Sequence, residues 1–285
     1  MSRTPALLAS AAALLGLAAC SGEPVAVATT TTSVARRTDA RDELVDTAAG
    51  RLHLRCDGAG PTTVVLIAGF TDGGDDWGPL QSSTARHARV CAYARFGTGL
   101  SDPPAIDQTF ATEADDLRSL LDTAGEPGPY VLVGHSFGGA EAVTFAARNA
   151  DDVTGLLLID ASPASWYDAI CSAADDADTF GELCASLADP SANVERLDTA
   201  AAFAEVSEVG SLGDLPMVVV TAAQRDFDGI GPAELERLDR VWNDGQEAWA
   251  RLSTSSRVVP VDDVGHFIHL ERPDLVTELL DGLLP

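Results

Sequence analysis

Residues 130–139 read Tyr130-Val131-Leu132-Val133-Gly134-His135-Ser136-Phe137-Gly138-Gly139, and a helical run that starts at Ala140 follows directly. An apolar, β-branched run therefore leads through Gly-His-Ser-Phe-Gly into a helix. This order is typical of a nucleophile elbow, a tight turn that raises a serine hydroxyl above the edge of a sheet. The alternative is a structural turn, because Gly-x-Ser-x-Gly is a common pattern in a glycine-rich chain. The strand–turn–helix context favours Ser136 as a nucleophile.

A serine hydroxyl becomes a good nucleophile only when a base takes its proton. Of the five histidines, His266 lies in Asp263-Val264-Gly265-His266-Phe267, directly after the last expected strand, residues 257–261. A loop that leaves the carboxyl end of this strand reaches the same edge of the sheet as the elbow. His135 is expected to turn away from the nucleophile, and His269 is expected to be a packing residue. The sequence therefore predicts His266 as the base.

From about residue 41 onwards, short β-branched runs alternate with longer helical stretches, which predicts an α/β fold with a mostly parallel sheet covered by helices. The expected strands are residues 51–56, 63–68, 89–94, 130–133, 155–160, 217–221 and 257–261. The expected helices are residues 112–124, 137–149, 232–252 and 273–283. Residues 162–213 interrupt the alternation and are expected to form a small cap inserted between two strands. Its large apolar residues either line a substrate pocket or attach the cap to the core; they are Trp166, Tyr167, Phe180 and Phe203.

Three further segments carry a resemblance to a known family: Ala68-Gly69-Phe70, residues 95–102 (Arg-Phe-Gly-Thr-Gly-Leu-Ser-Asp), and Gly265-His266-Phe267 followed by Pro273. With the elbow, they make residues 50–285 resemble the α/β-hydrolase superfamily, in particular its single-domain, lid-bearing esterases. The resemblance implies an α/β-hydrolase fold that works without a cofactor. It also implies that the backbone N–H groups of Phe70 and Phe137 form an oxyanion hole. Ala68 departs from the histidine that the family usually has.

The acid that orients His266 has two candidates, because the family order of serine, acid and histidine fits both. Asp160 ends the apolar run of residues 156–159, and some relatives have their acid there. Asp226 follows the next strand, which is the commoner location, but its loop lacks the expected glycine, and Arg225 beside it would make it part of a surface ion pair. Asp160 is preferred and Asp226 is the alternative acid. The alternative role for Asp160 is to cap a helix or turn of the inserted segment.

The residues and the resemblance together predict a serine hydrolase that cleaves a small ester or amide substrate through an acyl-enzyme on Ser136. A serine nucleophile argues against the haloalkane dehalogenase and epoxide hydrolase branches, which attack with aspartate. Two alternatives stay open. One is a cofactor-free lyase or perhydrolase that uses the same residues, and the other is a binding lipoprotein that keeps only the fold.

Four cysteines lie in the expected hydrolase domain, and an even number in an exported protein suggests disulfides rather than buried free thiols. None of them has metal-ligand spacing with histidine, so no metal site is expected. In the family that the chain resembles, the second and fourth strands are neighbours. The resemblance therefore implies a Cys56–Cys91 bridge, which leaves Cys171 and Cys184 to close a loop inside the cap.

The N-terminal residues resemble a bacterial lipoprotein signal. Arg3 precedes an apolar run of residues 7–19, which is short for a membrane span. The run ends in Leu17-Ala18-Ala19-Cys20, which resembles a lipobox. We expect residues 1–19 to be removed, Cys20 to carry the lipid, residues 20–40 to be a tether, and residues 41–285 to form the hydrolase. The protein would then be anchored to the outer face of the bacterial cell membrane. An ordinary secretory signal is the alternative.

The chain is strongly acidic, with 44 acidic against 18 basic residues and a formal net charge of −26. Such a surface repels phosphate backbones, which argues against nucleic acid as a partner. It also repels anionic lipids, so membrane attachment is expected only through the lipid on Cys20.

Overall fold

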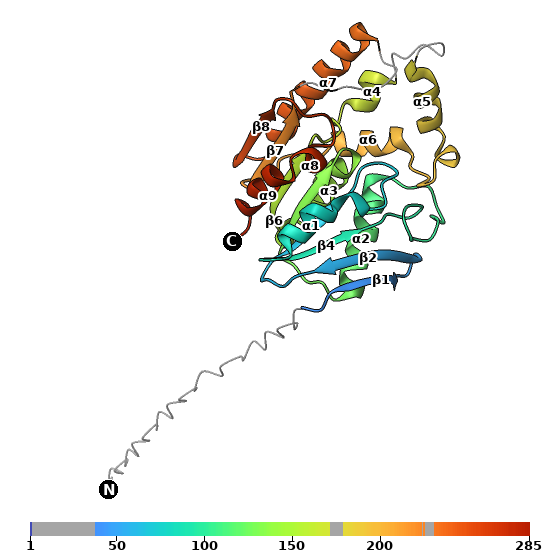
Figure 1. The fold of residues 1–285 in the computed structure, drawn as a ribbon. Coiled ribbons are helices and arrows are strands. Elements are labelled where there is room, and N and C mark those ends of the chain that lie inside the picture. Colours follow the sequence, from blue (N-terminus) through green and yellow to red (C-terminus); the bar gives the residue numbers. More distant parts are fainter. Residues whose placement is uncertain (2–37, 172–178, 224, 226–230) are drawn as a thin grey trace. The chain divides into compact units, whose positions relative to one another are not determined.

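The computed structural model describes residues 38–171, 179–223, 225 and 231–285, together with Met1, and the elements below all belong to the unit formed by residues 35–285 (Figure 1). An eight-stranded sheet in the order β1-β2-β4-β3-β5-β6-β7-β8 forms its centre. The two strand pairs β1–β2 and β2–β4 are antiparallel, and the other pairs are parallel. The predicted α/β-hydrolase fold is confirmed.

All seven expected strands are present, each within two residues of its expected bounds. The strands are β1 Arg41–Asp46, β2 Arg51–Asp57, β3 Thr63–Ile67, β4 Arg89–Tyr93, β5 Tyr130–His135, β6 Val153–Ile159, β7 Met217–Ala222 and β8 Ser256–Val261. The sequence did not predict β1, a largely exposed edge strand that pairs only with β2 among the described elements. Strands β3, β4 and β5 are buried along their whole length, as in parallel sheets covered on both faces.

The four expected helices are also present, as α2, α3, α7 and α9. The helices are α1 Gly78–Thr84, α2 Phe110–Ala124, α3 Phe137–Arg148, α4 Trp166–Ile170, α5 Thr179–Ala188, α6 Thr199–Ser207, α7 Pro232–Ala250, α8 Ile268–Glu271 and α9 Pro273–Asp281, with 3₁₀ turns at Asp75–Trp77, Ala150–Asp152 and Pro190–Ala192. Helix α2 shows why the bounds fall where they do. Thr109 and Thr112 form a capping box at its start, and Gly125 ends it with φ of +68°.

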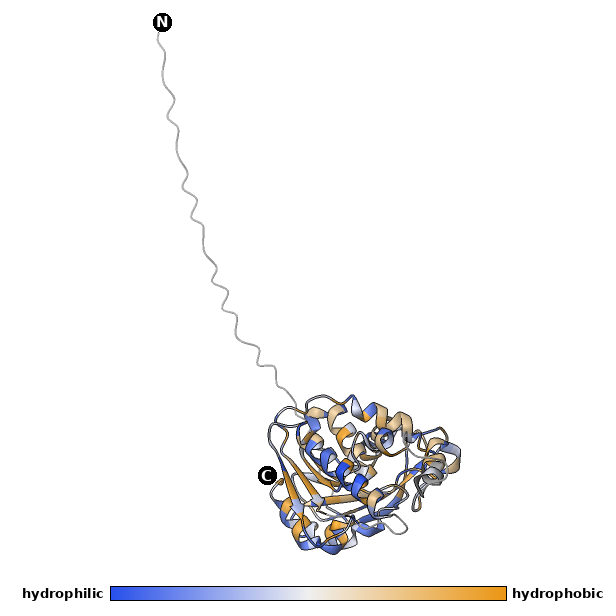
Figure 2. Ribbon diagram, turned by 90° about the horizontal axis from the view of Figure 1, so that it is seen from above, coloured by the Kyte–Doolittle hydropathy of each residue, from blue (hydrophilic) through white to orange (hydrophobic). Residues whose placement is uncertain are grey.

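The sheet has an apolar layer on each face. Helices α2, α3 and α7 contribute to the layer that contains Val65 and Leu132, whereas α1, α8 and α9 contribute to the layer that contains Val64 and Val131. The alternation of neighbouring strand residues between the two layers follows from the pleat. Figure 2 shows the result as apolar strands between helices of mixed polarity. The carboxyl ends of the parallel strands are left to carry the site.

Residues 162–213 lie between β6 and β7 and contribute α4, α5 and α6; we call them the insertion. Trp166 and Phe203 pack with their ring centroids 5.6 Å apart, and both contact the ring of Phe137. These two rings therefore attach the insertion to the core at the start of α3, and Tyr167 packs partly buried against the same core. The side chain of Phe180 lies outside the described residues.

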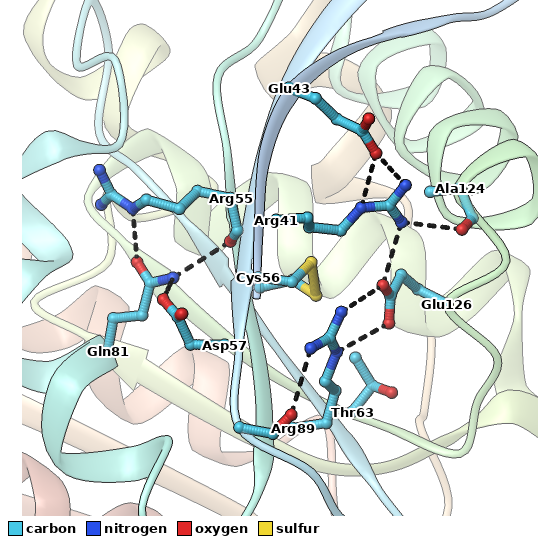
Figure 3. Close-up of a disulfide and its surroundings, with 12 residues drawn as sticks. Arg41, Glu43, Arg55, Cys56, Asp57, Thr63, Gln81, Arg89, Ala124 and Glu126 are labelled. Carbon is cyan, nitrogen blue, oxygen red and sulfur yellow. Dashed lines mark hydrogen bonds and ion pairs between the residues drawn. A yellow bond between two sulfur atoms is a disulfide. The ribbon is translucent and has the colours of Figure 1, made fainter. Parts of the chain in front are cut away.

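Both expected disulfides are present. Cys171–Cys184 lies within the insertion, and Cys56–Cys91 joins directly opposed residues of β2 and β4. Figure 3 shows the second bridge beside a buried ion pair, in which the Arg89 guanidinium binds both carboxylate oxygens of Glu126 at 3.0 and 2.6 Å. The ion pair lies at the amino end of β4, and the bridge joins the middle of that strand to β2.

No helix within the described ranges combines the length and the apolar character needed to cross a bilayer.

Candidate active site

Ser136 occupies the turn between β5 and α3 with φ of +53°, a conformation that a residue with a side chain rarely adopts. The two flanking glycines make this turn possible. A Cβ at Gly134 would lie 2.4 Å from the Gly138 carbonyl, and a Cβ at Gly138 would lie 2.3 Å from the Ala68 carbonyl. The close approach of β5, α3 and the loop after β3 therefore requires glycine at both positions, and the local geometry is that of a nucleophile elbow.

The two expected oxyanion donors come from different segments that meet at the elbow. Phe137 is the first residue of α3, where helix geometry leaves backbone N–H groups without intrahelical acceptors and the helix dipole favours a negative charge. Phe70 lies in the loop after β3, and its ring packs 5.2 Å from that of Phe137. The structure thus brings Phe70 and Phe137 together beside Ser136.

Asp160 and His266 are in contact. Asp160 directly follows β6, and its Oδ2 lies 2.7 Å from Nδ1 of His266. The Asp160 side chain is fully buried, whereas that of His266 is 11 % exposed. A carboxylate on Nδ1 holds the proton there and leaves Nε2 to act on a substrate or nucleophile. The His266 ring also packs 4.6 Å from the ring of His135, the neighbour of Ser136 in the chain.

A second cation holds the same carboxylate. Arg225 binds Asp160 through Nε at 2.9 Å and Nη2 at 2.5 Å, and Thr221 Oγ1 and the Ala222 N–H also donate to it. Burial raises the pKa of Asp160, but the hydrogen bonds from His266 and Arg225 outweigh it and bring this pKa below its ordinary value. The carboxyl group is therefore ionised at neutral pH.

The position of Arg225 beside Asp226 suggested a surface ion pair, but the Arg225 side chain is buried. It is 2 % exposed, it binds Asp239 at 3.2 Å, and it lies 5.3 Å over the Trp242 ring. The expectation was wrong because neighbours in sequence say little about a side chain that reaches another strand. Asp226 itself lies outside the described residues.

The two other histidines at the site support the loop that carries His266. The carbonyl of His266 accepts a hydrogen bond from Nε2 of His135, at 3.1 Å. His269 is buried and packs between Trp77 and His135, with ring centroids 4.5 Å from each. Burial lowers the pKa of His269 to about 4 and that of His135 well below its usual range, so both rings are neutral at pH 7.

Ser162 was not among the predicted site residues. Its backbone N–H donates to the Ser136 carbonyl at 3.0 Å, and its hydroxyl lies 3.3 Å from the Ser136 hydroxyl. Ser162 therefore braces the strained turn, and its hydroxyl is a hydrogen-bonding neighbour of the nucleophile candidate. The only signal in the sequence is its position two residues after Asp160, which is too weak to have identified it.

One group of possible metal ligands occurs among the described residues: Cys56, Cys91 and Glu126. Both sulfur atoms are consumed by the disulfide, and Glu126 is paired with Arg89 and Arg41. This group offers no thiolate to a metal ion. Cys20, the expected lipid-bearing residue, lies outside the described residues.

The chain is similar in sequence or in fold to several known proteins. The curated protein YqjL of Bacillus subtilis, whose function is uncharacterised, is 24% identical over 225 residues, which is 77% of this chain and 82% of that protein. Lipase LipV of Mycobacterium tuberculosis is 40% identical over 113 residues, which is only 38% of this chain and 41% of the lipase. The solved structure of a thermophilic esterase from Thermogutta terrifontis matches with a TM-score of 0.59 at 24% identity, covering 85% of this chain and 97% of the esterase.

The model of the alpha/beta hydrolase family matches residues 64–279, which run from β3 to α9 and include the elbow, Asp160 and His266. This match covers well over half of the chain, and the strand order and the elbow turn agree with it. The chain belongs to the alpha/beta hydrolase family.

Proposed function

We propose that the protein is a serine hydrolase that cleaves a small ester, or an amide, through an acyl-enzyme on Ser136. One combination of observations carries the proposal: Ser136 lies at φ of +53° in a strand-to-helix turn, and the ring of its chain neighbour His135 packs 4.6 Å from the ring of His266, which is bonded to Asp160. A strained backbone at a serine is retained when the surrounding structure enforces it, and such strain concentrates at active sites. The lipase and esterase among the compared proteins support an ester as the substrate.

In the proposed reaction, His266 takes the proton of Ser136 as the hydroxyl oxygen attacks the substrate carbonyl. The tetrahedral oxyanion accepts hydrogen bonds from the N–H groups of Phe70 and Phe137. His266 then passes the proton to the leaving group, and a water molecule repeats the cycle on the acyl-enzyme. Asp160 balances the charge of the imidazolium in both halves of the reaction.

The Asp160 carboxylate differs from that of a simple triad because it also neutralises Arg225. An acid shared in this way is held in one orientation by donors from β7 and its loop, so it positions the His266 ring rigidly. The insertion contributes the rings of Trp166 and Phe203 beside Phe137. We therefore propose that it acts as the cap over the acyl pocket.

A fluorophosphonate probe and p-nitrophenyl esters of increasing chain length test this function. We expect covalent labelling at Ser136 and measurable hydrolysis, and loss of at least about a thousandfold of kcat in Ser136→Ala and in His266→Ala. The matched control is Ser165→Ala, which removes a serine hydroxyl from the insertion and is expected to leave kcat within twofold. Absence of both labelling and hydrolysis in the folded wild type would contradict the proposal and favour a binding lipoprotein.

We also propose that the hydrolase is exported and held at the outer face of the cell membrane by lipid on Cys20. Support comes from the Leu-Ala-Ala-Cys sequence after an apolar run and from the even set of paired cysteines, which suits an oxidising compartment. Globomycin should block processing of the precursor, and Cys20→Ala should release the protein from membranes. Unchanged processing and mass under globomycin would leave only an ordinary secretory signal.

A further inference from the structure

Arg95 lies two residues after β4 and is buried beneath the loop that carries Phe70, with 5 % of its surface exposed. Its Nη1 donates to the Ala68 carbonyl at 2.7 Å and its Nη2 to the Gly69 carbonyl at 2.5 Å. The Gly69 carbonyl and the Phe70 N–H belong to one peptide unit. Since that unit is planar and trans, fixing the carbonyl toward Arg95 points the N–H in the opposite direction.

The next peptide unit is fixed by a residue of the insertion. The Thr71 N–H donates to Oε1 of Glu195, whose other oxygen accepts from Nε of Arg95 at 2.6 Å. Thr71 has φ of +65°, which is strained for a β-branched residue and needs such support. The peptide units on both sides of Phe70 are therefore held by one buried ion pair, although Glu195 lies 124 residues after Thr71 in the chain.

The contact between Glu195 and the core is close along its backbone as well. Gly97, with φ of +85°, lies so near residue 194 that an added Cβ would be 2.0 Å from the Val194 carbonyl oxygen. Gln108 also pairs with Leu197 in an isolated parallel bridge. Glu195 is thus seated by backbone packing on both sides, and its carboxylate reaches Arg95 from a fixed position.

Two other carboxyl groups, both from helices that pack on the sheet, also face Arg95. Glu113 of α2 lies 3.6 Å and Glu141 of α3 lies 3.3 Å from its guanidinium, and Tyr93 donates a hydrogen bond to Glu141. Burial raises the pKa of Glu141 to about 7 and that of Glu113 well above its ordinary value. A glutamine at position 113 keeps the size of the side chain and its capacity to hydrogen-bond, so it is a matched change in the same cluster.

We propose that Arg95 and Glu195 are positioning residues for the oxyanion hole: together they orient the Phe70 N–H, and through Glu195 the oxyanion hole depends on the docked insertion. This inference rests on the proposed function, since it concerns the oxyanion of that reaction. It gives the insertion a role in kcat itself, in addition to any role in substrate choice.

The test compares Glu195→Gln with Glu113→Gln in the mature protein, using a p-nitrophenyl ester that the wild type hydrolyses. Glu195→Gln should lower kcat by about 10- to 100-fold, less than the 10²–10³ for a deleted donor, because the N–H is misoriented rather than removed. KM should stay within threefold. Glu113→Gln should keep kcat within twofold, because Glu113 belongs to α2 and lies 3.6 Å from the Arg95 guanidinium, whereas Glu195 also binds the Thr71 N–H of the loop.

A trifluoromethyl ketone separates positioning from general loosening of the fold, because its adduct with the serine carries an oxyanion. The affinity of Glu195→Gln for the ketone should fall by the same factor as kcat, whereas KM for the ester should stay within threefold of wild type. Glu195→Asp keeps the charge but shortens the side chain by one methylene; it should lose an intermediate factor, and it serves as the test if Glu195→Gln does not fold. The inference would be overturned if a folded Glu195 variant kept kcat within twofold of wild type. It would also be overturned if ketone affinity fell by the same factor by which KM rose. A wild type that is neither labelled nor active would instead overturn the proposed function.

Discussion

The two ends of β4 each carry a buried arginine, and the two arginines are used differently. At the amino end, Arg89 meets one carboxylate in a bidentate pair with Glu126, and its remaining nitrogen donates to the backbone carbonyls of Asp39 and Gly58. At the carboxyl end, Arg95 faces three carboxyl groups and holds the loop of Phe70. The strand between them is fully buried.

Arg89 is paired with one buried carboxylate, whereas three buried carboxyl groups surround Arg95. Arg89 and Glu126 neutralise each other, and the disulfide Cys56–Cys91 lies beside them (Figure 3). Three carboxyl groups share the single guanidinium of Arg95, and burial raises the pKa of two of them, Glu113 and Glu141; this arrangement costs stability and is tolerated at the end of the sheet that carries the site. Changes at the amino end should therefore affect stability, whereas changes at the carboxyl end should affect chemistry.

The largest effect is expected at the carboxyl end of the sheet from Asp160→Asn. An amide cannot hold the correct tautomer of His266, so kcat should fall by about 10⁴-fold. The same change leaves Arg225 without its buried carboxylate and should lower the free energy of unfolding by about 3–5 kcal/mol. Ester hydrolysis and urea unfolding measure the two losses.

Asp226→Asn is the matched variant for the alternative acid. If Asp160 serves as the acid, this variant should retain kcat within a few fold. A large loss of kcat in Asp226→Asn, with little loss in Asp160→Asn, would instead assign the acid to the loop after β7.

The next largest effect is expected from Glu126→Gln at the amino end. The change leaves the buried guanidinium of Arg89 without its anion and weakens a second contact, to Arg41. Breaking one partner of a buried pair costs about 3–5 kcal/mol of unfolding free energy. The kcat for ester hydrolysis should stay within twofold of wild type at a temperature where the variant is folded. A selective loss of kcat would show that the two ends of β4 are coupled.

A similar but smaller loss is expected from the paired change Cys56→Ala and Cys91→Ala. The bridge closes a loop of 35 residues, for which loop-closure entropy predicts a stabilisation of about 3–4 kcal/mol. Removal of Cys171 and Cys184 provides the comparison, because that loop of 13 residues predicts about 3 kcal/mol and lies in the insertion. Only the second pair of changes is expected to alter KM. Equal effects of both pairs on KM would contradict the separation of the two regions.

The sequence predicted the fold well where burial decides the local structure. Strands such as residues 63–67 are buried on both faces and read as continuous apolar runs, so composition alone identifies them. The edge strand β1 has a mixed, charged sequence that gives no such signal. The helices of the insertion were also missed individually, because their positions depend on tertiary contacts such as the packing of Trp166 on Phe203.

The site residues could be predicted from the sequence where short local motifs mark them. The glycines around Ser136 and the loop of His266 identify themselves by spacing, and the structure brings both segments to one edge of the sheet. The choice between Asp160 and Asp226 could not be settled from the sequence, because the order of serine, acid and histidine in the chain allows both. The cations were missed for a related reason: Arg225 and Asp160 are 65 residues apart, and Arg95 and Glu195 are 100 residues apart. Such pairs leave no local pattern.

The smallest expected effect concerns the neutral histidine that supports the site. The pKa of His269 falls to about 4 in the folded protein, against about 6.5 for an exposed histidine. The unfolded chain therefore binds a proton first as the pH falls, so this histidine's contribution to stability is complete above pH 6.5 and is lost progressively toward pH 4. Between pH 7 and pH 5 the loss should be about 2 kcal/mol.

His269→Gln isolates this contribution from that of Glu141, whose raised pKa acts in the opposite direction but is common to both proteins. The difference in unfolding free energy between wild type and His269→Gln, measured in urea, should therefore shrink by about 2 kcal/mol from pH 7 to pH 5. A difference that stays constant with pH would mean that His269 is protonated in the folded state as readily as in the unfolded chain. That result would contradict its buried position between Trp77 and His135, and with it the rigid support that the loop of His266 needs.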